Sequence, residues 1–97
     1  MAKGYWIGRV DVKSDEGYKP YAAANAAIFK KFGGRFVIRG GKFENPEGSS
    51  RKRNVVIEFP SYQAALDCYR SPDYQAAAEY LKRSCDIIEF VIVEGTE

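Results

Sequence analysis

The feature that most constrains the fold is that two predicted strands are hydrophobic on both faces. Residues 87–93 are Ile-Ile-Glu-Phe-Val-Ile-Val, and residues 54–59 are Asn-Val-Val-Ile-Glu-Phe. Successive side chains of a β-strand point to opposite faces of the sheet, so both segments place apolar side chains on each face. A sheet that contains these segments therefore needs a cover on both faces.

Two more strands and a set of amphipathic helices complete the pattern. Residues 5–12 and 35–39 have strand-like alternation, and residues 18–32 carry apolar side chains at spacings of three and four, which is typical of a helix. Ser61 and Ser71 each precede a further helical segment and are good N-caps. The order of elements predicts an α+β, ferredoxin-like split βαβ fold, with a four-stranded antiparallel sheet and helices on one face.

The second face of this sheet has no helix left to cover it. The most economical cover is the same face of a second copy, which predicts a homodimer formed sheet against sheet. Such an interface should bury about 1,200–2,000 Å² in total, or more. Since 97 residues fit one folding unit, residues 1–97 are expected to form a single domain.

Composition argues against several classes of site. No apolar run approaches the ~20 residues of a membrane span and no signal peptide pattern is present, so no membrane partner and a cytoplasmic location are expected. The chain has no histidine, and its two cysteines, Cys68 and Cys85, are predicted to lie in separate helical segments. This disfavours a disulfide framework and metal or haem ligation, so neither a metal nor a cofactor is expected.

A basic run, Arg51-Lys52-Arg53, follows a segment rich in proline, glycine and serine. With a net charge of only +2, we interpret the run as a solvated hairpin loop that should tolerate substitution by serine. An RNA-recognition module with this strand order would need stacking aromatic residues on the third strand, whereas residues 53–59 offer valines and an acid. No nucleic-acid partner is expected.

Eight short motifs run through nearly the whole chain. They are Gly4-Tyr5-Trp6-Ile7, Tyr21-Ala22-Ala23-Ala24-Asn25, Gly33-Gly34-Arg35-Phe36, Arg39-Gly40-Gly41, Glu58-Phe59-Pro60-Ser61, Ala64-Ala65, Tyr69-Arg70-Ser71-Pro72-Asp73-Tyr74-Gln75 and Val91-Ile92-Val93-Glu94-Gly95. With them the chain resembles the bacterial family called domain of unknown function 1330 (DUF1330), in the dimeric α/β-barrel superfamily. The resemblance implies a ferredoxin-like subunit whose sheet packs against a partner's sheet, but it implies no activity and no catalytic residue.

The wider superfamily includes cofactor-free monooxygenases, muconolactone-type isomerases and haem-degrading enzymes with a pocket between sheet and helices. Their histidine-dependent sites cannot be present here.

Three polar residues are the strongest site candidates. Asn25 falls on the buried helix stripe, where it is either a structural amide or a group that orients a ligand in a pocket. Arg39 and Glu58 lie on neighbouring strands, either as structural charges or as an anchor for a carboxylate or phosphate and a general base whose pKa burial raises. The ligand hypothesis expects all three to open onto one cavity.

Arg9, Trp6 and Tyr69 are weaker ligand-binding candidates, since core or interface packing explains the two aromatic residues equally well. Two functions remain open. The first is a pocket between sheet and helices that binds or turns over a small organic acid or aromatic metabolite. The second is a non-catalytic dimeric module that binds a metabolite or a protein. Convergence of the charged candidates around a perturbed carboxylate would favour an enzyme, with Glu58 as the weak catalytic candidate, whereas scattered positions would favour a module.

Overall fold

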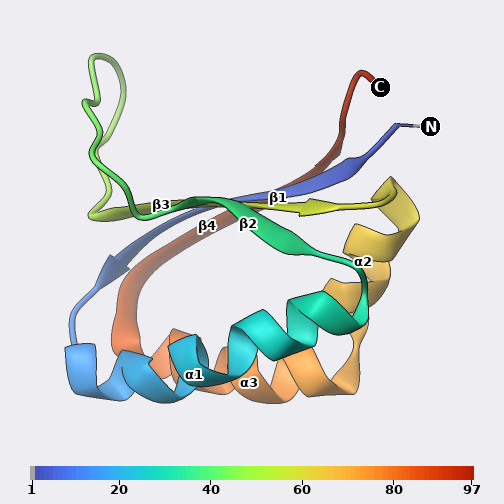
Figure 1. The fold of residues 1–97 in the computed structure, drawn as a ribbon. Coiled ribbons are helices and arrows are strands. Elements are labelled where there is room, and N and C mark those ends of the chain that lie inside the picture. The colour runs from blue at the N-terminus through green and yellow to red at the C-terminus, as the bar shows by residue number, and fades with distance from the viewer. Residues whose placement is uncertain (1) are drawn as a thin grey trace.

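The computed structural model describes residues 2–97 as one antiparallel sheet with helices beneath it (Figure 1). The strands are β1 (Gly4–Val12), β2 (Arg35–Arg39), β3 (Arg53–Phe59) and β4 (Cys85–Glu94). Their order across the sheet is β2-β3-β1-β4, and every neighbouring pair is antiparallel. This confirms the ferredoxin-like α+β fold predicted from the order of elements.

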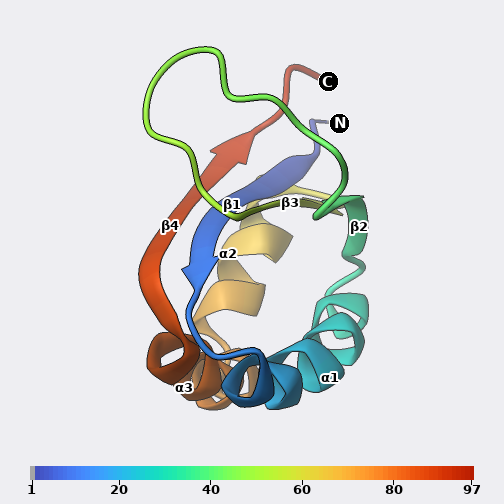
Figure 2. The ribbon, with the colours of Figure 1, turned by 90° about the vertical axis from the view of Figure 1, so that its left-hand side faces the viewer.

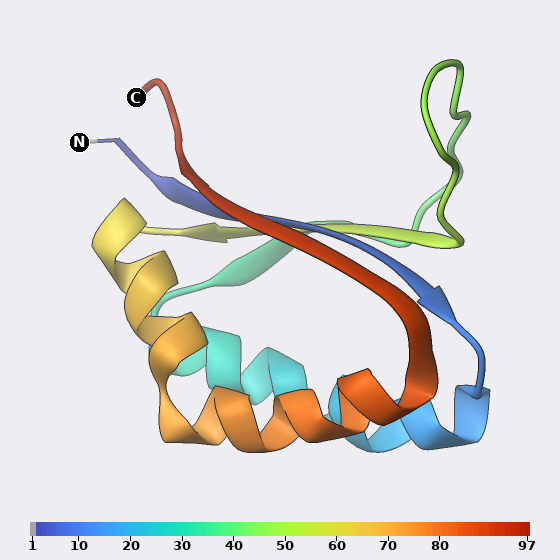
Figure 3. The ribbon, with the colours of Figure 1, turned by 180° about the vertical axis from the view of Figure 1, so that it is seen from behind.

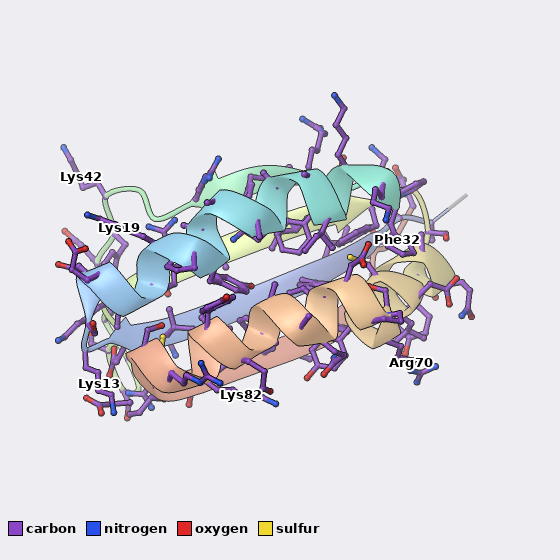
Figure 4. The ribbon with its side chains drawn as sticks, turned by 90° about the horizontal axis from the view of Figure 1, so that it is seen from below. Lys13, Lys19, Phe32, Lys42, Arg70 and Lys82 are labelled. Atoms are coloured by element: carbon purple, nitrogen blue, oxygen red, sulfur yellow. The ribbon has the colours of Figure 1, made fainter. Side chains whose placement is uncertain are left out.

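Each helix begins at a serine whose hydroxyl oxygen accepts a hydrogen bond from a backbone N–H in the first turn. The helices are α1 (Asp15–Lys31), α2 (Tyr62–Arg70) and α3 (Pro72–Ser84), and their caps are Ser14, Ser61 and Ser71. Figure 4 shows α1 and α3 side by side under the sheet. None of the helices in residues 2–97 is both long and apolar enough to cross a membrane.

Trp6, on β1, occupies the centre of the core between the sheet and the helices. Its side chain is 1% exposed, and its indole Nε1 donates a hydrogen bond to the backbone oxygen of Ala65, 2.9 Å away. Five aromatic rings have centroids within 6.1 Å of the indole centroid: Phe29, Phe59, Tyr69, Tyr74 and Phe90. This aromatic cluster fixes the distance between the sheet and the helix layer.

All three helices lie on one face of the sheet, so the outer face carries no helix (Figure 3). The middle of the outer face is a row of apolar side chains, one from each strand: Ile38, Val56, Ile7 and Val91. Ion pairs centred on Glu58 and Glu89 flank this row. The two-sided hydrophobicity of the sequence therefore corresponds to one face in the core and one apolar face that carries no helix.

Residues 40–52, which we call the arm, connect β2 to β3 and rise from the outer face (Figures 1 and 2). Arg9 Nη2 donates hydrogen bonds to Asn45 Oδ1 and to the Ser49 backbone oxygen, both at 2.7 Å. Arg51, whose side chain is only 16% exposed, donates two hydrogen bonds to the carboxylate of Glu89. These contacts hold the arm against the sheet.

Two expectations need correction. Arg51-Lys52-Arg53 is not a uniformly solvated run, because Arg51 is ion-paired beneath the arm and Arg53 is the first residue of β3. Cys85 does not lie in a helix, since it begins β4 immediately after α3. Both thiols are free and buried, and burial raises the pKa of Cys68 to about 12, so that this thiol stays protonated near neutral pH.

Candidate functional site

A small cavity lies between the inner face of the sheet and the helices. Its walls are largely aromatic: Trp6, Tyr18, Tyr21, Phe29, Phe36 and Phe90. The free space is about 20 Å³, which is enough for one water molecule. Gly8 also lines the cavity, and a β-carbon there would lie 2.5 Å from Phe90 Cε1. The missing side chain at Gly8 thus admits the Phe90 ring, a close approach that is typical of a glycine within a strand.

Asn25 projects from α1 into this cavity. It lies one turn beyond Tyr21 on the buried stripe of the helix, and it is 5% exposed. Among residues 2–97, its Oδ1 has no hydrogen-bond partner. A buried amide oxygen without a partner costs about 1–3 kcal/mol, so it needs an explanation, such as a water or a ligand.

Arg53 enters the same cavity from the opposite wall. Arg53 pairs with the inward-facing Val10 of β1, so the Arg53 side chain also points toward the helices. The guanidinium carbon of Arg53 lies 5.8 Å from the centre of the Tyr18 ring. Its Nε is buried and also lacks a partner within the described chain, whereas its Nη1 lies against Gly40 at the edge of the sheet. Two residues that line the cavity therefore carry, within residues 2–97, one unpartnered acceptor and one unpartnered donor.

The remaining polar groups near the cavity are neutral tyrosines. The hydroxyls of Tyr21 and Tyr74 are 2.9 Å apart, and burial raises the pKa of both far above the ordinary tyrosine value. Of the described residues that line the cavity, none carries a carboxylate, imidazole or thiol. Residues 2–97 also contain no group of three or more side chains that could hold a metal ion.

Glu58 lies on the outer face of the sheet, away from this cavity. Its carboxylate accepts a hydrogen bond from the Tyr5 hydroxyl at 3.0 Å and is close to Arg35 Nη2 at 3.1 Å and Lys3 Nζ at 3.4 Å. The Tyr5 hydrogen bond, followed by the interactions with Lys3 and Arg35, lowers the pKa of Glu58 below its ordinary value. Of the two alternatives considered for Glu58, the structure therefore favours a structural charge over a general base with a raised pKa.

Arg39 ends the edge strand β2, and its guanidinium lies 4.3 Å above the ring of Phe36. It is exposed and does not line the cavity. Because Glu58 is on the opposite face, the expected convergence of Asn25, Arg39 and Glu58 on one cavity is wrong. Arg39 stacks on Phe36 and Glu58 pairs with Arg35, so these two charged candidates do not share a site.

The other candidates divide between the cavity and the surface. Trp6 lines the cavity. Tyr69 packs edge-on against the Trp6 indole, with ring centroids 5.7 Å apart, but does not line the cavity. Arg9 lies on the outer face and holds the arm. The structure thus brings together two of the six predicted site residues, Trp6 and Asn25, and adds Arg53.

The sequence and the fold have recognisable relatives. Residues 3–96 match the model of the family described as "Domain of unknown function (DUF1330)". No curated protein is significantly similar in sequence. A solved protein of unknown function from Rhodopseudomonas palustris is similar with a TM-score of 0.76 at 16% identity, covering 99% of this chain and 84% of that one.

Two further solved structures are similar in fold. A dimeric ferredoxin-like protein of unknown function from Jannaschia sp. CCS1 has a TM-score of 0.64 at 18% identity, covering 94% of this chain and 97% of that one. SnoaB, a cofactor-independent oxygenase from Streptomyces nogalater, has a TM-score of 0.66 at 16% identity, covering 100% and 96%. At these identities the likeness establishes the shared ferredoxin-like fold.

Proposed function

Because the chain belongs to the DUF1330 family, whose function is unknown, we propose that it is a dimeric module that binds a small, largely apolar molecule in the cavity beneath its sheet. The observation that carries this proposal is the pair of unpartnered polar atoms, Asn25 Oδ1 and Arg53 Nε, in one aromatic cavity. Pockets for small molecules are typically lined by apolar and aromatic side chains with a few polar groups that orient the ligand.

The surroundings of the charged residues support binding rather than acid–base catalysis. A general base must lie within hydrogen-bonding distance of the proton that it removes. The carboxylate that we considered for this role, Glu58, is on the other face and is held ionised by Tyr5, Lys3 and Arg35. The aromatic walls suit an apolar ring or chain, and the two polar atoms suit one polar group on it.

Ligand binding can be tested by thermal unfolding of the wild type and of an Asn25→Leu/Arg53→Met double variant with a library of small cyclic alcohols, phenols and acids. A ligand at a hundred times its Kd adds about 2.7 kcal/mol. For a chain of this length that corresponds to a rise in Tm of roughly 10 °C or more. We expect hits that stabilise the wild type and lose most of this effect in the double variant. Equal shifts for both proteins, or no hits, would contradict the proposal.

For the dimer, we propose that the outer face of the sheet packs against the same face of a second copy. The apolar row of Ile38, Val56, Ile7 and Val91 is flanked on both sides by ion pairs, which matches the apolar centre and polar rim of protein interfaces. A similar solved structure is itself described as dimeric. A monomer would leave this row in water.

Light scattering of an Ile7→Asp variant tests this interface. Ile7 is at the centre of the row and pairs with both Val56 and Val91, so a carboxylate there would be buried without a partner in the dimer. We expect a dimeric wild type, a monomeric Ile7→Asp variant, and an unchanged dimer for Ala26→Asp, an exposed position on α1. A wild type that is monomeric at micromolar concentration would disprove the interface.

A further inference from the structure

The two unpartnered atoms in the cavity differ in hydrogen-bonding character. Asn25 Oδ1 can only accept a hydrogen bond, and Arg53 Nε can only donate one. A hydroxyl group has the matching character for both, because it can donate its proton to Oδ1 and accept from Nε. A carboxylate has no proton to donate, so one of its oxygens would face Oδ1 as acceptor against acceptor.

The charge of Arg53 does not by itself call for an anion in the cavity. Arg53 is only half-buried, and its Nη1 lies beside Gly40 at the edge of the sheet, so the guanidinium is not confined to the apolar interior. Its Nε is the buried part and acts as one directed donor. An anion drawn into the cavity would leave water for aromatic walls, which costs more than the same move by a neutral hydroxyl.

The free space of about 20 Å³ accommodates one oxygen-sized group, so the rest of a ligand must displace a wall. Phe36 is the wall on the shorter of the two edge strands. It lies on the five-residue edge strand β2, which pairs with β3 alone, and the register shifts between Phe36 and Ile38. Edge strands with such irregularities open at lower free energy than central strands.

We propose that the ligand of this cavity presents a neutral hydroxyl group on an apolar ring, as in a phenol or a cyclic alcohol, held between Asn25 Oδ1 and Arg53 Nε with the ring against Phe36. This assignment rests on the proposed function, since it specifies the ligand of that same cavity. The sequence allowed a small organic acid or an aromatic metabolite, and the assignment excludes the organic acids.

The test compares three monosubstituted benzenes, phenol, toluene and the larger benzoate, by NMR titration of the isotope-labelled protein. The Trp6 indole N–H and the Asn25 side-chain amide report on the cavity itself, since both residues line it. We expect phenol to shift these signals with an affinity about tenfold or more above that of toluene and benzoate. Benzoate binding best would overturn the hydroxyl assignment, because it would mean that Asn25 presents its amide nitrogen to the cavity.

Variants identify the source of the preference. Asn25→Leu, which also fills part of the cavity, should weaken both probes and remove most of the advantage of phenol over toluene. Arg53→Met should weaken phenol while leaving toluene unchanged. Lys52→Met, at the exposed neighbouring position, is the matched control and should behave as the wild type. Equal binding of phenol and toluene by the wild type would overturn the hydroxyl assignment while leaving the binding proposal standing. If none of the three probes moves the cavity signals, even at millimolar concentration, both proposals fail, and the two polar atoms share only a water molecule.

Discussion

Replacing Asn25 by leucine should stabilise the protein, because it removes a buried acceptor that no protein group satisfies. Asn25 is 95% buried, since its exposure is 5%, and its Oδ1 has no partner in the described chain. Relief of such an atom is worth about 1–3 kcal/mol, and leucine gains up to about 0.5 kcal/mol in helix propensity. Against this, the larger side chain fills a cavity of about 20 Å³ and so introduces some strain. We expect a net gain of about 1 kcal/mol, or roughly 4–8 °C in Tm.

The assay is urea unfolding followed by the fluorescence of Trp6, the single tryptophan of the chain. Both proteins must be compared at equal concentration, since the stability of a dimer depends on concentration. Ala26→Leu, at an exposed position on the same helix, controls for a leucine on α1 and should lie within about 0.5 kcal/mol of the wild type. A loss above about 1 kcal/mol for Asn25→Leu would refute the reasoning, because it would show that protein groups depend on the amide.

Two further changes probe the rest of the molecule. Because the Tyr5 hydrogen bond lowers the pKa of Glu58, this carboxylate stabilises the fold above its ordinary value of 4.5 and loses that effect as the pH falls through the lower folded value. Glu58→Gln should therefore lower the urea midpoint near neutral pH. The difference in midpoint between Glu58→Gln and the wild type should shrink below about pH 4, and a difference that grows in acid would contradict the lowered pKa of Glu58. Gly8→Val should destabilise by about 1–3 kcal/mol, because its β-carbon would meet the Phe90 ring at 2.5 Å. Gly41→Val should be nearly neutral, because an added β-carbon there would have no atom of residues 2–97 beyond its chain neighbours within 4 Å. Thermal unfolding of both variants checks this, and similar losses at the two glycines would argue against the Phe90 contact.

Helix spacing located Asn25 correctly, because three- and four-residue spacings determine which side chains share a helix face. Strand positions were harder to assign from the sequence. Arg53 was missed because it was counted with the preceding basic loop, although it follows the same alternation as Val55, Ile57 and Phe59, which all face the helices. The alternation already placed Arg53 on the inner face, but the predicted strand began one residue later, at Asn54.

The alternation of side chains along a strand could not tell on which face of the sheet Arg39 and Glu58 lie. Both faces of β3 are apolar, so the sequence gives no sign of which face the helices cover and hence where Glu58 lies. On β2 the register shifts between Phe36 and Ile38, so that Arg39 pairs with Val55 on the helix side, whereas strict alternation from Arg35 would put it on the outer side. A bulge of this kind depends on the pairing of two strands and is not visible in either one alone.

The pairing of β1 with β4 places the first strand of the chain beside the last, from Gly4 opposite Glu94 to Val12 opposite Cys85. During synthesis on the ribosome, β1 and its Trp6 must wait until residues 85–94 are made before their second neighbour exists. In that interval the nascent sheet has β1 as an unprotected edge, the kind of surface on which other chains pair and aggregate. A chain that stops before residue 85 would leave that edge open permanently, so β4 decides whether β1 of the newly made polypeptide is covered or stays exposed to chaperones and proteases.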